Sequence, residues 1–226
     1  MVNPFARIQK KFGILLNYFL QKKLVKLFTI LMKLNILTRV GAKGSNFNMT
    51  YFDELKRAMD WLNLKPDTYF LGQAVSYAGT AITNTLKDVN ADKLLEMPVN
   101  EDMQMGMTIG MALNGTVPIS IYPRWNFLAL ATNQVVNHLD KIRIMSDNEY
   151  SPKVIIRTSI GSQRPIHPQY QHVADLTAGF KAMCDSIDII RLDEASQIFD
   201  SYKYAYERTD GRSTILVEWG DFYNEK

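Results

Sequence analysis

Cysteine and histidine are scarce in this chain, which has one cysteine, Cys184, and three histidines among its 226 residues. A single cysteine excludes an internal disulfide framework and fits a reducing compartment. No cysteine and histidine residues have the spacing of a zinc site, so we expect no metal held by this chain. A hydrophobic content of 46% and a charged content of 22% are ordinary for a globular protein with one sizeable domain.

The common phosphate-binding motifs are also missing. The sequence has no Gly-x-Gly-x-x-Gly after a strand and no Walker-type phosphate loop. It has no Gly-x-Ser-x-Gly nucleophile elbow either. The dinucleotide-binding, ATPase and serine-hydrolase interpretations therefore lack support. The body of the chain has no basic patch interleaved with aromatic residues, and we expect no nucleic-acid partner.

Acidic residues are absent from the first 48 positions, which hold nine of the 26 basic residues. The other 178 residues carry 17 basic and all 23 acidic residues, so the body has a net charge of −6. The longest uncharged run of the first segment, Phe12 to Gln21, is shorter than the ~20 residues that span a bilayer.

Three interpretations of residues 1–48 stay open. The segment is a basic amphipathic helix on an anionic membrane, an organellar targeting segment, or an extension upstream of a true start at Met49. The third is favoured, because the composition changes abruptly at Met49 and the residues after it lead directly into a helix. We therefore predict an N-terminal extension at 1–48 and one domain at 49–226. The predicted location is cytoplasmic, with an organellar matrix or a membrane surface as the alternatives that residues 1–48 leave open.

Short apolar strands alternate with helices through the rest of the chain. The expected strands lie at 68–72, 94–99, 116–122, 154–158, 187–191 and 214–218. The expected helices lie at 53–62, 79–86, 101–113, 126–145, 173–183 and 194–208. This alternation predicts an α/β fold, a three-layer sandwich with a mostly parallel sheet covered by helices on both faces. Such sheets bind ligands beyond the carboxyl ends of their strands.

Glu101 is the most informative residue of this domain, because it follows an expected strand and opens an apolar helix. One explanation is helix capping, for which Asn100, Glu101 and Asp102 are all suited. The other is a carboxylate held in a dry pocket, where it exchanges a proton with a cofactor. The local pattern alone favours capping, whereas the rest of the chain favours the cofactor interpretation.

Two glycines, Gly106 and Gly110, lie on one face of the helix that follows Glu101. Glycine inside a helix costs ~1 kcal/mol relative to alanine, so another backbone is expected to approach closely there. That backbone belongs either to the sheet of the same domain or to a helix of a second subunit.

Four segments together resemble a known family. Gly72-Gln73-Ala74-Val75 resembles a Gly-Glu-Asp-Val motif, and 97–106 resembles Pro-Ile-x-Glu-x-x-x-x-Gly. Residues 124–127 and 133–137 resemble an aromatic strand end followed by Asp-Gln-Ile-x-Asn. His167 and His172 repeat a His-x-x-x-x-His spacing after an Arg-x-x-x-Gly strand. In this order, residues 68–226 resemble the pyrimidine-binding domain of the thiamine-diphosphate-dependent transketolase and 2-oxoacid dehydrogenase superfamily, most closely its beta subunits.

The resemblance implies roles for the matched residues. Glu101 corresponds to the glutamate that contacts a ring nitrogen of the aminopyrimidine of thiamine diphosphate, promotes its imino tautomer and so activates the cofactor. Phe127 and Trp125 correspond to aromatic positions that pack on the pyrimidine. His167 and His172 correspond to residues near the substrate carbonyl, where a histidine is a natural proton donor. Each aromatic or histidine taken alone is explained equally well by packing or by a loop hydrogen bond.

Two departures from the family restrict the role that this chain can have. The first is Gln73, which corresponds to a cofactor-binding position where the family has glutamate. The second is the absence of the Gly-Asp-Gly and Asn-Asn motif that binds diphosphate and Mg²⁺. We therefore expect a separate alpha-type subunit to hold the diphosphate and Mg²⁺, in a heterotetramer or another symmetric assembly. The expected reaction acts next to the carbonyl of a small substrate, by 2-oxo acid decarboxylation or ketol transfer. The alternative is a non-catalytic scaffold or regulatory partner of such an enzyme.

Overall fold

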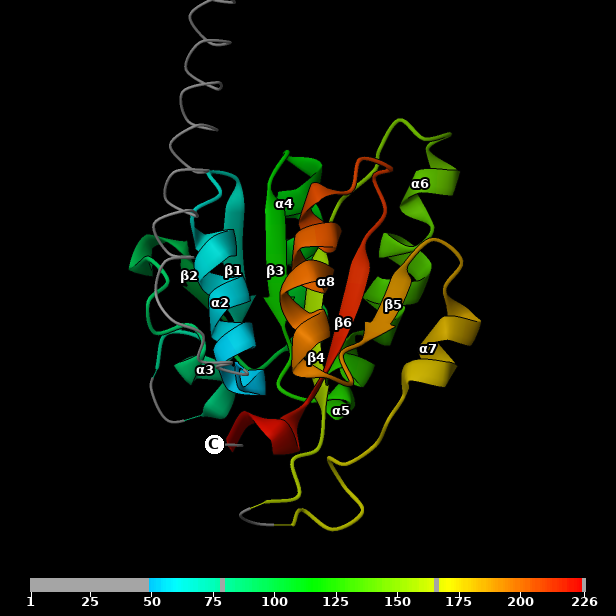
Figure 1. Ribbon diagram of the computed structural model, residues 1–226. Helices are drawn as coiled ribbons and strands as arrows, with labels where there is room; N and C mark the ends of the chain where they lie inside the picture. The colour runs from blue at the N-terminus through cyan, green and yellow to red at the C-terminus, as the bar shows by residue number, and fades with distance from the viewer. Residues whose placement is uncertain (1–48, 78–79, 165–166, 225–226) are drawn as a thin grey trace, which may run out of the picture. The chain divides into compact units, whose positions relative to one another are not determined.

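The computed structural model describes residues 49–77, 80–164 and 167–224. The described residues form a six-stranded sheet with the strand order β2-β1-β3-β4-β6-β5 (Figure 1). The strands are β1 (Thr68–Gly72), β2 (Leu94–Glu96), β3 (Val117–Ile121), β4 (Ile155–Ile160), β5 (Asp188–Arg191) and β6 (Thr214–Trp219). Each neighbouring pair is parallel, which confirms the predicted fold class. The predicted extension at 1–48 lies outside the described residues.

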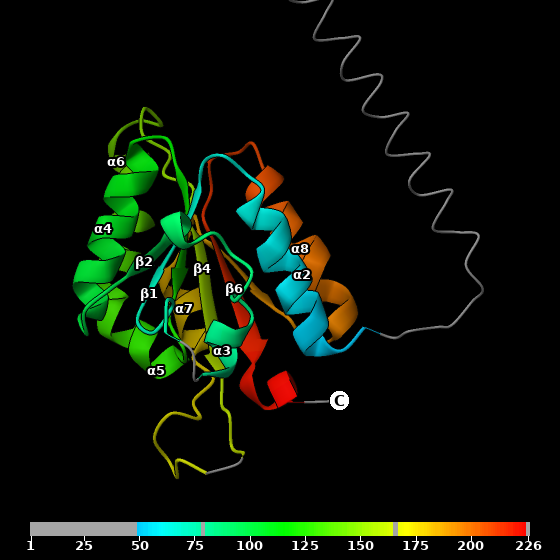
Figure 2. The same cartoon turned by 90° about the vertical axis from the view of Figure 1, so that its left-hand side faces the viewer.

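Helices cover both faces of this sheet. They are α2 (Tyr51–Asn63), α3 (Ala81–Asn84), α4 (Glu101–Leu113), α5 (Trp125–Leu128), α6 (Ile142–Met145), α7 (Thr177–Met183) and α8 (Ala195–Glu207). Figures 1 and 2 show α2 and α8 side by side on one face, with α4, α5 and α6 on the other. None of the described helices is both long and apolar enough to cross a membrane.

Two hydrophobic cores lie on opposite sides of the sheet because successive strand residues point in opposite directions. In β4, Ile155 joins the core under α2 and α8, whereas Ile156 joins the core under α4 and α5. In β6, Leu216 faces the first core and its neighbours Ile215 and Val217 face the second. Burial on both faces explains why the strands are almost continuously apolar.

The segment predicted as one long helix at 126–145 is broken in the structure. It consists of α5, a 3₁₀ turn at Ala129–Ala131, a π-helical turn at Gln134–Leu139, and α6. The wide turn donates Asp140 N–H to Val135 O at 2.9 Å and brings the side chain of Asp140 inside, where it is fully buried. There Asp140 accepts hydrogen bonds from the backbone of Asp185 and Ser186, so the extra residue of the turn serves tertiary contacts.

Gly72 ends β1 at a point where only glycine fits. A Cβ atom there would lie 2.7 Å from the backbone oxygen of Ile121 at the end of β3. The close approach of these two strand ends brings the residues that follow them to one edge of the sheet. Because all strands are parallel, the carboxyl ends of the others meet at the same edge.

Candidate active site

Glu101 is buried at the first position of α4, with 6% of its surface exposed. Gln73, which follows β1, donates a hydrogen bond from Nε2 to Glu101 Oε1 at 3.1 Å. Tyr122, which follows β3, donates from its hydroxyl to the carbonyl oxygen of Glu101 at 3.2 Å. Burial raises the pKa of Tyr122, so this hydroxyl stays protonated. Residues from beyond three strand ends therefore meet around Glu101.

The N-cap of α4 is provided by a residue other than Glu101. Asn100 is the N-cap residue, and its side chain accepts a hydrogen bond from Met103 N–H at 2.9 Å. Glu101 instead turns its carboxylate towards Gln73. The helix has its cap without Glu101, although a negative charge at this end is still favourable to the helix dipole.

Glu96 fixes the turn that carries Gln73. Its carboxylate accepts backbone N–H groups of Ala74 at 2.5 Å, Val75 at 2.9 Å and Ser76 at 2.9 Å, together with the Ser76 hydroxyl. Burial opposes ionisation, but the hydrogen bonds outweigh it and hold the pKa of Glu96 below its ordinary value. The turn after β1 is thus organised around an anion that the chain itself supplies.

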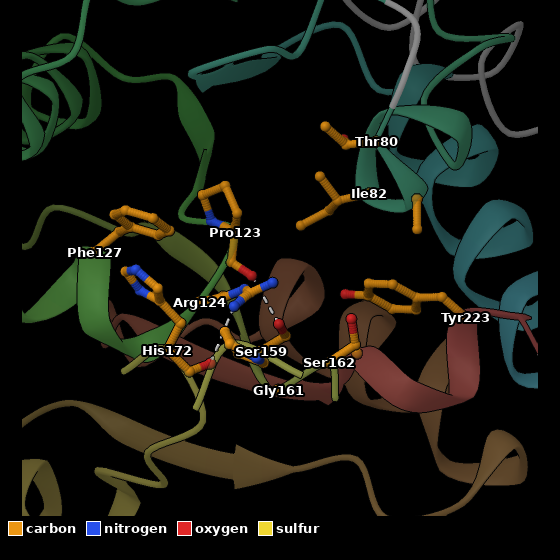
Figure 3. Close-up of a pocket in the computed structure, with 13 residues that line it drawn as sticks. Thr80, Ile82, Pro123, Arg124, Phe127, Ser159, Gly161, Ser162, His172 and Tyr223 are labelled. Atoms are coloured by element: carbon orange, nitrogen blue, oxygen red, sulfur yellow. Dashed lines mark hydrogen bonds between the residues drawn. The ribbon is translucent and has the colours of Figure 1, made fainter. Parts of the chain in front are cut away.

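A pocket of about 500 Å³ lies along the same edge of the sheet (Figure 3). Its lining comes from the chain after β3, the end of β4 with the loop after it, the start of α3, and the chain after β6. Gly220 is needed here, because a Cβ atom would lie 2.9 Å from Ser162 N. The volume suits a small organic molecule.

Phe127 and His172 form one wall of this pocket. Their rings are stacked, with centroids 5.2 Å apart and an interplanar angle of 21°. His172 has a φ of +61°, in the left-handed region, and its buried Nδ1 has no hydrogen-bond partner among the described residues. The imidazole is therefore positioned by stacking and by its backbone, and its Nδ1 is buried without a partner among the described residues.

Trp125 and His167, also predicted for the site, lie elsewhere. Trp125 is fully buried and packs on Phe180 with ring centroids 4.9 Å apart, so its position is that of a core residue. His167 is exposed, and its Nδ1 accepts the backbone N–H of Gln169 at 3.0 Å. Neither residue lines the pocket, and Glu101 and Gln73 do not line it either. The structure therefore brings the predicted site residues together in two pairs, Gln73 with Glu101 and Phe127 with His172.

A buried ion pair lies beneath the pocket. Arg157 in β4 donates to Glu218 in β6 through Nε at 2.6 Å and Nη2 at 3.0 Å, and both side chains are fully buried. The hydroxyls of Tyr202 and Tyr223 also donate to Glu218, and Arg157 donates to Thr85 at 2.8 Å. Tyr223 lines the pocket as well, so this network holds one of its walls in place.

Glu96, Arg124, Glu218 and Tyr223 have structural positions that were not predicted from the sequence. A signal existed for Glu218, because a charged residue inside the apolar run 214–219 predicts a buried partner. Arg124 also lies just beyond the carboxyl end of a strand, where parallel sheets bind ligands. Among the described residues, no group of three or more His, Cys, Asp or Glu side chains is placed to hold a metal ion.

This arrangement defines an α/β protein whose polar side chains gather beyond the carboxyl ends of a parallel sheet. Comparison with known proteins shows a distant relationship. The chain is a distant homologue of the beta subunits of 2-oxoacid dehydrogenases, which confirms the resemblance predicted from its motifs.

Three similar proteins illustrate the relationship. The pyruvate dehydrogenase E1 component subunit beta of Gracilaria tenuistipitata var. liui is 31% identical over 136 residues, which cover 58% of this chain and 42% of that protein. The 2-oxoisovalerate dehydrogenase subunit beta of Bacillus subtilis (strain 168) is 26% identical over 136 residues, covering 58% and 41%. A structure described as a split gene transketolase, inactive beta4 tetramer, matches with a TM-score of 0.59 at 14% identity, covering 76% of this chain and 51% of that one.

The extent of these matches is partial. The chain spans about two fifths of the length of the two curated relatives, which are 42% and 41% covered. At 14% identity the transketolase structure supports the fold alone. No protein-family model matches the chain.

Proposed function

We propose that this chain is the pyrimidine-binding subunit of a split thiamine-diphosphate enzyme and acts with a separate diphosphate-binding subunit. The observation that carries the proposal is the buried Glu101 at the carboxyl edge of the sheet, with its hydrogen bond from Gln73. The distant homology to beta subunits of 2-oxoacid dehydrogenases supports it.

The geometry of Glu101 fits the expected contact with an aminopyrimidine. Gln73 donates a hydrogen bond to Oε1 of Glu101, and no hydrogen bond from the described residues reaches Oε2. A carboxyl with 6% of its surface exposed has little water to compete for a proton shared at that second oxygen. Phe127 offers a half-buried aromatic face, stacked on His172, for packing against a planar ring.

The division of work between the two subunits follows from what this chain provides. Thiamine diphosphate, when bound, supplies the nucleophilic carbon that attacks the carbonyl next to the bond being cleaved. Residues of this chain would hold the pyrimidine end and share a proton at Glu101. The partner would hold the diphosphate and Mg²⁺, in a heterotetramer or another symmetric assembly. The reaction class is 2-oxo acid decarboxylation or ketol transfer on a small carbonyl substrate.

A non-catalytic scaffold or regulatory subunit is the second candidate. The observation that favours it is Gln73, which stands where the resembled family has glutamate. An amide keeps the hydrogen bond to Glu101 but cannot exchange a proton as a carboxyl does. Catalytic measurements on the assembled complex separate the two candidates.

The experiment is a comparison of Glu101→Gln with Asp102→Asn in the full chain, assembled with its diphosphate-binding subunit. Both variants remove one negative charge from the first turn of α4, but Asp102 is exposed. We expect Glu101→Gln to lower thiamine-dependent turnover by about 10²-fold or more, because the amide cannot share the proton. Asp102→Asn should stay close to wild type, and both should keep the melting temperature within about 3 °C.

Exchange of the acidic thiazolium proton of thiamine with deuterium provides a second readout that needs no substrate. We expect the wild-type complex to accelerate this exchange and Glu101→Gln to abolish the acceleration. Wild-type activity in Glu101→Gln would refute the role of Glu101. A complex that assembles yet accelerates neither exchange nor turnover would make the scaffold the correct function.

A further inference from the structure

Arg124 lies inside the pocket and is not used by the proposed function. It follows β3 after Tyr122 and Pro123, and it lines the pocket together with residues of the loop after β4. In the view of Figure 3 its guanidinium lies between the Phe127–His172 stack and Tyr223. The cation is therefore in the middle of the space that a ligand would fill.

The charge of Arg124 is not neutralised within the described part of the chain. Other arginines pair closely with carboxylates, as Arg157 does with Glu218 at 2.6 Å and Arg208 with Asp210 at 2.7 Å. For Arg124, no carboxylate among the described residues lies within 4.0 Å. Its protein contact is a long hydrogen bond from Nη1 to the carbonyl oxygen of His172, at 3.4 Å.

The carboxylate of Asp221 acts on the charge of Arg124 from a distance, and it already accepts a hydrogen bond from another residue. Asp221 Oδ1 accepts the backbone N–H of Gln163 at 2.8 Å. Burial lowers the pKa of Arg124, and the charge of Asp221 opposes that effect. The guanidinium nevertheless remains a cation at any physiological pH, with most of its donors unused.

The guanidinium of Arg124 is only half-buried and lines the pocket, and none of its nitrogens is among the buried polar atoms without a partner, so a ligand in the pocket can reach its unused donors. The rest of the lining suits a small ligand: Ile82, Pro123 and the ring of Tyr223 are apolar, and Ser162 adds a hydroxyl. His172 adds an imidazole ring that is stacked on Phe127. A ligand with one anionic group and a short carbon skeleton would satisfy Arg124 and cover these apolar surfaces.

We propose that Arg124 binds the anionic group, a carboxylate or a phosphoryl group, of a small carbonyl substrate of this protein. This inference rests on the proposed function for the reaction, and on the pocket alone for the anion. Arg124 is then a specificity-determining residue: it selects charged substrates over neutral ones of the same size. The planar fork of a guanidinium matches either anion with two hydrogen bonds.

The first test is a titration of the full chain alone, followed by the NMR signals of Ser162 and His172 backbone amides at constant ionic strength. The probes are pyruvate, inorganic phosphate and the neutral ketone dihydroxyacetone. We expect saturable shifts with at least one anion, and the stronger of the two identifies the anionic group. No saturable shift with either anion would overturn the proposal.

Three variants make the titration specific. Arg124→Gln should weaken anion binding about 10- to 100-fold, the range that the loss of charge-assisted hydrogen bonds gives. Arg124→Lys keeps the charge and should stay within about 10-fold of wild type, which shows that the fold is intact. Arg164→Gln removes an exposed arginine on the loop after β4 and should change binding less than two-fold. Equal weakening in Arg124→Gln and Arg164→Gln would overturn the proposal.

The second test separates this inference from the proposed function. In the assembled complex, Arg124→Gln should raise KM for an anionic substrate about 10-fold or more while changing kcat little, because it removes a binding contact. An active complex with an unchanged KM would refute the role of Arg124 and leave the proposed function standing. Anion binding that needs Arg124, together with no thiamine-dependent activity in any assembly, would refute the proposed function and leave the anion site standing.

Discussion

Gln73 and Glu101 are 28 positions apart in the chain, and their side chains meet in a hydrogen bond of 3.1 Å beyond the ends of two neighbouring strands. The bond has a definite polarity, because an amide N–H donates and a carboxylate oxygen accepts. Gln73 therefore gives Glu101 a neutral partner, and a glutamate at that position would give it a second negative charge.

Gln73→Glu should make the stability of the chain depend on pH between about 4 and 8. Two carboxyls at hydrogen-bond distance share a proton, which raises the folded-state pKa of one of them above its unfolded value. Relative to wild type, the variant keeps its stability below the unfolded pKa and loses it as the pH rises through the folded pKa. The loss is about 1.4 kcal/mol for each pH unit that separates these two pKa values. Urea denaturation at several pH values measures the difference.

Gln73→Met is the matched control for this variant, since it removes the hydrogen bond without adding charge. Its loss of stability should be about 1 kcal/mol and independent of pH. Parallel pH profiles for Gln73→Glu and wild type would show that the two carboxyls do not interact.

Glu218→Gln should destabilise the fold strongly, because it leaves Arg157 fully buried without a counter-charge. Loss of one partner of a buried ion pair costs about 3–5 kcal/mol. Tyr202→Phe removes only one donor to Glu218 and should cost about 1–3 kcal/mol. Tyr204→Phe changes an exposed tyrosine of the same helix, with 49% of its surface exposed, and should cost less than about 0.5 kcal/mol. Equal unfolding midpoints for Tyr202→Phe and Tyr204→Phe would contradict the network.

Gly110→Leu should lower the oligomeric state of the protein without unfolding the chain. A Cβ atom at Gly106 or Gly110 meets no described atom within 4 Å, so close packing on the domain's own sheet does not explain these glycines. A helix contact with a second subunit remains the prediction. Light scattering measures the assembly, and circular dichroism confirms the fold.

Gly106→Ala, in the same helix, tests the stability of the chain on its own. Alanine should stabilise α4 by up to about 1 kcal/mol, because the helix interior favours it and no described atom obstructs it. An assembly that persists in Gly110→Leu would instead show that α4 is free in the complex.

Cys184 should react slowly with thiol reagents in the native protein. Burial, with a smaller contribution from the charge of Asp140, raises the pKa of its thiol from 9.0 to about 11. The thiolate is the reactive form, so its fraction at pH 8 is about 100-fold below that of an ordinary cysteine. Because Cys184 is the one cysteine of the sequence, a colour reaction with a disulfide reagent reports on it alone. Equal rates for native chain and chain unfolded in guanidinium would contradict the expectation.

A chain that begins at Met49 should keep the fold of the described domain. All strands of the described sheet and both cores come from residues after Met49. Helix α2 also has its own capping box, in which Thr50 and Asp53 exchange hydrogen bonds. Thermal melting of the two chains should agree within about 3 °C. Insolubility of the shorter chain would show that residues 1–48 are a structural part of the domain, and loss of binding to anionic vesicles would support the membrane-surface interpretation.

Much of the fold is local enough to be predicted from the sequence. The helix predicted at 101–113 is α4 with the same bounds, and the strand predicted at 68–72 is β1. Both are continuous apolar segments closed by clear signals, such as Asn100 at one end of α4 and Asn114-Gly115 at the other. The long helix predicted at 126–145 failed because a π-helical turn depends on what Asp140 contacts far along the chain.

The candidate site was less predictable because it depends on pairs that are distant in sequence. The sequence marked Gln73, Glu101, Phe127 and His172 as site residues, but it did not predict that Gln73 bonds to Glu101 or that Phe127 stacks on His172. Trp125 is aromatic like Phe127 and lies two positions before it, and only its packing on Phe180 shows that it belongs to the core. An aromatic residue has no sequence feature that tells a pocket wall from a core face.

Glu96 has a consequence for where a diphosphate can bind. In many parallel α/β proteins, the backbone N–H groups just after the first strand form a cradle that receives a phosphate from solution. In this chain the N–H groups of Ala74, Val75 and Ser76 already receive the carboxylate of Glu96. The carboxylate of Glu96 takes the position that a phosphate would have, so these N–H groups are not available to the charged end of a cofactor. The proposed function accordingly assigns the ring end of the cofactor to this chain and its charged end to a neighbouring subunit.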